Sequence, residues 1–145
     1  MRALFVSSSS GETDKYAASL RCLGHDVDIV RYDVEGATDE STCSQIAQHK
    51  PELIVYIGSR WGGQLSTHAL ARINHDVAPA VHLCSDAADP PWWDLLTEYH
   101  YAGAFALQVA IDGNKAWPLA DTQMTALTPI DPAHFNGIVK PHAER

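Results

Sequence analysis

Strand and helix patterns alternate from Ala3 to Ile111, and this alternation is what most constrains the fold. Short runs of apolar or alternating residues predict strands at 3–7, 27–32, 53–57, 78–84 and 104–111. Helical spacing of apolar residues predicts helices between them, at 13–23, 38–49, 65–73 and 91–99. Such a chain is typical of a parallel sheet with helices on both faces. We therefore expect a three-layer α/β/α domain, Rossmann-like or flavodoxin-like, with a five-stranded parallel sheet.

The regular pattern stops near Gly113, which divides the sequence into two parts. Residues 1–113 form the expected α/β domain, and the length of 145 residues suits one hydrophobic core. Residues 114–145 contain four prolines and no sustained helical period, so we expect an irregular segment there. A helix that would cover the strand at 104–111 is missing from the pattern. We expect a second α/β domain, linked through 114–145, or another copy of the chain to complete the structure.

Composition excludes several classes of partner. The formal net charge is −8 and the ten Lys and Arg residues are scattered, which argues against nucleic-acid binding. The longest strongly apolar stretch, 53–57, is too short to span a membrane, and the N-terminus lacks the form of a signal peptide. Cys22, Cys43 and Cys84 are widely spaced and read as reduced thiols of a cytoplasmic protein. The eight histidines show no ligand spacing, so no metal site is predicted.

Ligands of open parallel sheets bind at the carboxyl ends of the strands, which selects the loops 7–13, 58–64 and 85–93. The first loop offers hydroxyl groups and one glycine before a helix, a combination that suits a phosphate or a sugar. Its candidate ligand-binding residues are Ser8, Ser9, Ser10, Gly11 and Thr13. A polar turn that caps the helix is the alternative. Neither a P-loop nor a GxGxxG fingerprint is present.

The second loop places an aromatic residue between small ones. Trp61 can stack on a planar ring or a sugar face, and Arg60 can pair with a phosphate. Ser59 and Gly62 complete this candidate binding segment. The alternative is that Trp61 packs beneath the loop.

The third loop carries two carboxylates and two tryptophans. Asp86 and Asp89 are the candidate general bases, although carboxylates at this position also cap a helix. Trp92 and Trp93 point about 100° apart on a helix, so one can join the core while the other faces a ligand.

The first loop resembles the phosphate loop of the flavodoxin family. The residues that carry the resemblance are Ser8 to Thr13, followed by Ala17 and Leu20. The resemblance implies an electron carrier that binds FMN, with Trp61 stacking on the flavin and Trp92 or Trp93 as a second ring. In this sequence Val6 stands where that family usually has an aromatic residue.

A second resemblance covers more of the chain. The alternation from Met1, the run Leu-Gly-His-Asp-Val at 23–27 and the segment 127–135 resemble the N-terminal half of a GT-B-type glycosyltransferase and its crossing into the second domain. The resemblance implies a domain that contributes the acceptor side of an interdomain cleft, without a cofactor and inactive alone. A sugar acceptor or nucleotide-sugar would be the partner, and Asp86 or Asp89 the base.

Three functions therefore stand in order. The first is the acceptor-side domain of a glycosyltransferase-like protein. The second is a flavodoxin-like FMN protein. The third is a non-catalytic interaction domain in which the strand at 104–111 and the following segment form a partner surface.

Overall fold

The computed structural model describes residues 1–8, 12–58, 64–84, 90–111 and 121–126, with the side chains of 12, 90–93, 125 and 126 left aside. Six strands are found: β1 (Arg2–Ser7), β2 (Asp26–Arg31), β3 (Leu53–Ile57), β4 (Ala80–Cys84), β5 (Leu107–Ile111) and β6 (Gln123–Ala126). The helices are α1 (Glu12–Cys22), α2 (Asp39–Gln48), α3 (Thr67–Arg72), continued by a π-helical turn at Ile73–Val77, and α4 (Pro90–Tyr101).

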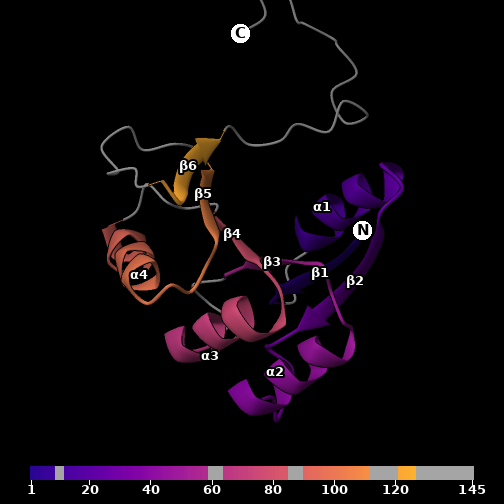
Figure 1. Cartoon of the computed structure of the whole chain (residues 1–145), viewed down its shortest axis with the longest axis horizontal. Helices are drawn as coiled ribbons and strands as arrows, with labels where there is room; N and C mark the ends of the chain where they lie inside the picture. The colour runs from indigo at the N-terminus through magenta and orange to yellow at the C-terminus, as the bar shows by residue number, and fades with distance from the viewer. Residues whose placement is uncertain (9–11, 59–63, 85–89, 112–120, 127–145) are drawn as a thin grey trace, which may run out of the picture.

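The strands form one parallel sheet in the order β2-β1-β3-β4-β5-β6 (Figure 1). The α/β class and the parallel sheet predicted from the alternation are thereby confirmed. The expected number of five strands is corrected to six, because β6 pairs with β5 in the segment expected to be irregular. Only four residues long and poor in aliphatic side chains, β6 gives no run that a sequence pattern detects.

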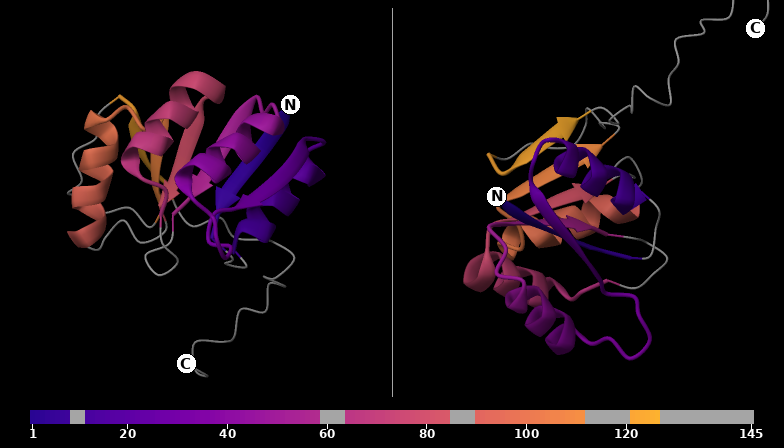
Figure 2. Two further views of the ribbon diagram at one scale, coloured as in Figure 1. Left: turned by 90° about the horizontal axis from the view of Figure 1, so that it is seen from below. Right: turned by 90° about the vertical axis from the view of Figure 1, so that its right-hand side faces the viewer.

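Helices cover the two faces of the sheet unequally. α2, α3 and α4 lie on one face and α1 lies on the other (Figures 1 and 2). Side chains alternate between these faces along each strand, as the pleat requires. The α1 face buries a cluster of Ala3, Phe5, Ala17, Val27, Val55 and Ile57. The opposite cluster is larger and contains the strand residues Leu4, Val6, Val30, Ile54 and Tyr56 with residues of all three helices or the turns beside them.

Local signals explain most of the helix ends. α1 ends at Cys22, and Gly24 adopts a φ of +82°, as expected of a glycine after a helix. α2 was expected to be capped by Asp39 or Ser41. Its N-cap is Thr38, whose side chain accepts a hydrogen bond from the Ser41 backbone while the Ser41 hydroxyl accepts one from the backbone of Thr38.

The described residues after β5, namely 121–126, contain β6 and no helix. Several apolar side chains of β4 and β5 on the α1 face stay only half-buried, among them Val81, Leu83 and Leu107. No helix in the described part of the chain has the length and apolar content needed to cross a bilayer.

Candidate functional site

The carboxyl ends of all six strands meet at one edge of the sheet, because every strand pair is parallel. Ser8 and Thr13 are the predicted binding residues whose side chains are described there, and both are buried. Trp92 and Trp93 lie in the first turns of α4, without a description of their side chains. The remaining candidates lie outside the described residues: Ser9, Ser10, Gly11, Ser59, Arg60, Trp61, Gly62, Asp86 and Asp89.

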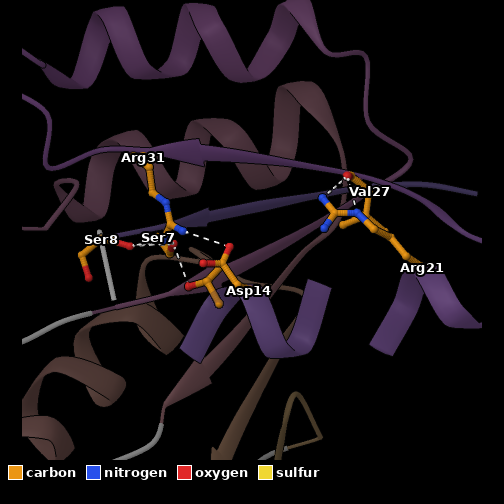
Figure 3. A network of polar contacts seen from close by, with 7 residues as sticks. Ser7, Ser8, Asp14, Arg21, Val27 and Arg31 are labelled. Carbon is orange, nitrogen blue, oxygen red and sulfur yellow. Dashed lines mark hydrogen bonds and ion pairs between the residues drawn. The ribbon is translucent and has the colours of Figure 1, made fainter. Parts of the chain in front are cut away.

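A polar network centred on Arg31 closes the end of β1 (Figure 3). The Arg31 guanidinium donates to Ser7 Oγ at 2.8 Å and to the carbonyl of Ser8. Its other nitrogen pairs with the carboxylate of Asp14, in the first turn of α1, at 3.3 Å. Thr13 Oγ1 donates to Ser7 Oγ at 2.9 Å, and Ser7 Oγ in turn donates to the Ser8 carbonyl. One arginine of β2 thus joins the end of β1 to the start of α1.

The network commits the hydroxyl groups that the first loop was expected to offer. Ser7 Oγ donates one hydrogen bond and accepts two, which uses its full capacity. Thr13 spends its only donor on Ser7, and Ser7 and Thr13 are both 0% exposed. Their direct role is therefore to hold the turn after β1. Arg31 was missed from the sequence, although its place at the end of a strand beside β1 was a usable signal.

A cavity of about 290 Å³ lies beside this network. Its walls come from the connection between β2 and α2 and from the residues before α3. The lining residues are Tyr32, Asp33, Val34, Ala37, Thr38, Asp39, Gln64 and Leu65. Gln64 belongs to the predicted loop 58–64, whereas the connection after β2 was not among the three loops selected from the sequence.

Hydrogen bonds tie the walls of this cavity to the sheet and to each other. The Tyr32 hydroxyl donates to the carbonyl of Ile57 at 3.3 Å, which joins the end of β2 to the end of β3. The Asp39 carboxylate accepts from the backbone and the hydroxyl of Ser66, the N-cap of α3. The cavity is therefore held open by contacts within the chain, as a preformed site requires.

An aromatic row runs behind the cavity on the same face of the sheet. The ring of Tyr56 stacks at 5.6 Å on both Tyr32 and Phe105, and His82 stacks on Phe105 at 4.9 Å. Tyr99 of α4 meets His82 and Phe105 edge-on. Burial raises the pKa of the Tyr56 and Tyr99 hydroxyls and lowers the pKa of His82 to about 3. All three groups are therefore neutral at neutral pH.

The other titratable groups form no second centre in the described residues. His68 and His75 are exposed, and no group of three His, Cys, Asp or Glu side chains within the described ranges is placed to hold a metal ion. Cys22 is exposed, whereas Cys43 and Cys84 are buried, and none of the three forms a disulfide.

Comparison with known proteins leaves the site to be judged on its own geometry, since no family model matches the chain and no curated protein matches it significantly.

Proposed function

We propose that this chain is the acceptor-side domain of a two-domain glycosyltransferase-like protein. A second α/β domain would follow it and supply the nucleotide-sugar site. Under this proposal the carboxyl edge of the sheet forms one wall of the cleft between the domains. The resemblance of residues 23–27 and 127–135 to GT-B enzymes supports the proposal from the sequence.

The direction of β6 is the observation that carries the proposal. β6 is parallel to β5, and its last residue, Ala126, pairs with Ile111 at the carboxyl end of β5. Residues 127–135, which resemble the crossing between the domains, therefore begin at the edge where the connections after β1, β2, β3 and β4 also begin. A domain attached there would face those connections.

The proposal assigns acceptor activation to Asp86 or Asp89. Both follow β4 in the sequence and precede α4, at the same edge. Transfer of a sugar to a hydroxyl group requires a base within hydrogen-bond reach of that hydroxyl, and a carboxylate can serve. The proton of the acceptor hydroxyl passes to the carboxylate as the new glycosidic bond forms and the nucleoside diphosphate leaves.

The test uses the product of the whole gene. We expect the reading frame to continue past Arg145 into a second α/β domain, and the purified product to release nucleoside diphosphate from a nucleotide-sugar when an acceptor is added. Asp86→Asn or Asp89→Asn should abolish the release, whereas Asp26→Asn, at the opposite edge of the sheet, should not. A frame that stops at Arg145 without a second domain encoded beside it overturns the proposal.

A flavodoxin-like FMN protein is the second candidate, and the strand order favours it. The order β2-β1-β3-β4-β5 is that of the flavodoxin-like doubly wound sheets, in which the flavin binds beside β1 and β3. The turn from Ser8 to Thr13 follows β1 at that point. A yellow purified protein, or quenching of added FMN fluorescence, would support this candidate. A colourless sample without quenching would exclude it.

A further inference from the structure

The cavity beside Tyr32 occupies a distinctive place in the sheet. One wall follows β2 and the other follows β3, and these two strands flank β1 on either side. The chain reverses its direction of winding at β1, which is where open α/β sheets form their ligand crevice. The cavity therefore lies where topology alone would place a ligand.

The charges around the cavity select against anions. Two carboxylates, Asp33 and Asp39, are part of the lining. Lys, Arg and His are all missing from the lining, which consists entirely of described residues. A phosphate placed there would be repelled by both carboxylates, whereas a neutral hydroxyl group can donate hydrogen bonds to them.

An apolar floor accompanies these polar groups. The ring of Tyr32 is 7% exposed and is held in place by stacking on Tyr56, and Leu65 is 5% exposed. The Tyr56 hydroxyl lies against Tyr32 and the backbone of Leu65, in a side chain that is 1% exposed. This hydroxyl forms no hydrogen bond of acceptable geometry, so a polar group without a partner lies directly behind the floor.

Gln64 supplies the donor that the carboxylates lack. Its carbonyl oxygen accepts a hydrogen bond from the Tyr99 hydroxyl at 2.9 Å, which fixes the orientation of the amide. The two N–H donors of the amide have no partner in the described part of the chain, and the side chain is exposed. The cavity thus offers acceptors, donors and an apolar surface, which together match a ring that carries several hydroxyl groups.

We propose that this cavity binds a neutral monosaccharide unit and discriminates against its phosphorylated form. The binding site rests on the cavity alone. Its assignment as the subsite for the acceptor sugar rests on the proposed function, because a transferase would place the acceptor at this edge.

The direct test titrates the chain, labelled with ¹⁵N, with glucose, galactose and mannose, and separately with their 6-phosphates. At least one neutral sugar should shift the backbone amide signals of residues 32–39 and 64–66 in a saturable manner. The matching 6-phosphate should bind at least about tenfold more weakly, because it meets the two carboxylates. Absence of saturable shifts in these residues, or equal binding of the phosphate, would overturn the proposal.

Two variants with matched controls test the assigned contacts. Gln64→Glu keeps an acceptor for Tyr99 and removes both N–H donors, so the affinity should fall about five- to tenfold. Gln45→Glu makes the same change on the exposed surface of α2 and should leave the affinity unchanged. Asp33→Asn should narrow the preference over the phosphate, whereas Asp26→Asn should not. A Gln64→Glu variant that binds as well as the wild type contradicts the assignment.

The two proposals fail separately. Saturable sugar binding by this chain, with no transferase activity in the whole gene product, would retain the site and remove the function. Transferase activity without amide shifts at the cavity would retain the function and remove the site.

Discussion

The imidazole ring of His82 stacks on the ring of Phe105 with their centroids 4.9 Å apart, and neither ring nitrogen finds a hydrogen-bond partner within the described part of the chain. His82 is 0% exposed and lies in β4, at the middle of the sheet. A protonated ring at this position would be a buried charge without a counter-ion. The ring therefore serves as a neutral aromatic group in the core.

The first prediction concerns acid stability. The pKa of His82 is lowered by burial from 6.5 to about 3, so the unfolded chain binds a proton that the folded chain rejects. The contribution to stability is complete above pH 6.5 and is lost as the pH falls toward 3, by up to about 1.4 kcal/mol per pH unit. Urea unfolding from pH 7 to pH 4 measures it.

The control for this prediction compares two identical substitutions. His82→Phe should flatten the decline of the unfolding free energy with acid, because no group at that position then binds a proton in the unfolded chain. His68→Phe, at an exposed position of α3, should leave the decline as in the wild type. An equally steep decline in His82→Phe and the wild type would show that His82 does not carry the effect.

The second prediction concerns the network at the end of β1. Arg31→Met removes donors to Ser7 Oγ and the Ser8 carbonyl and should lower the free energy of unfolding by about 1–3 kcal/mol. Arg72→Met, which breaks an exposed ion pair with Glu40, should cost less than about 1 kcal/mol. Chemical denaturation of both variants gives the comparison, and equal losses would refute the role given to Arg31.

The third prediction concerns the attachment of β6. The amide of Gln108 donates to the Leu96 carbonyl at 3.1 Å and accepts from Gln123 at 3.0 Å, in a side chain that is 1% exposed. Gln108→Leu leaves the Gln123 amide without this acceptor and should cost about 1–3 kcal/mol. Amide hydrogen exchange should accelerate in β6 more than in β1. Gln45→Leu is the surface control, and uniform acceleration across the sheet would contradict a local role.

The fourth prediction concerns thiol reactivity. Cys22 is exposed, Cys43 and Cys84 are buried, and burial also raises the pKa of Cys43. One thiol should therefore react rapidly with an aromatic disulfide reagent in the native protein, and all three should react in denaturant. Cys22→Ser should remove the rapid phase. Two rapidly reacting thiols in the native wild type would show that one buried cysteine is accessible.

The sequence predicted the elements whose signals are local. Apolar runs such as 53–57 marked the strands, and Gly24 marked the end of α1, because each depends on neighbouring residues alone. β6 escaped prediction because its place depends on pairing with β5 rather than on its own four residues. Residue type and neighbours were thus enough for the strands of the interior and not for the strand at the margin.

The candidate site was predicted in position more than in composition. The carboxyl edge follows from the alternation of strands and helices, and Gln64 lies within a predicted loop. Arg31, Tyr32 and Asp33 were missed because their roles require knowing that β2 lies directly beside β1. A strand order assumed at the outset would have brought the end of β2 into the search.

The two ends of the sheet give practical guidance for attaching this protein to a surface or to a reporter. The N-terminal ammonium of Met1 lies 3.9 Å from Glu52, which precedes β3, at the amino edge of the sheet. A tether fused before Met1 therefore leaves from the edge opposite the cavity and keeps the approach to the cavity clear. A fluorophore joined just after β6 would instead begin at the same edge as the cavity and could report its occupancy.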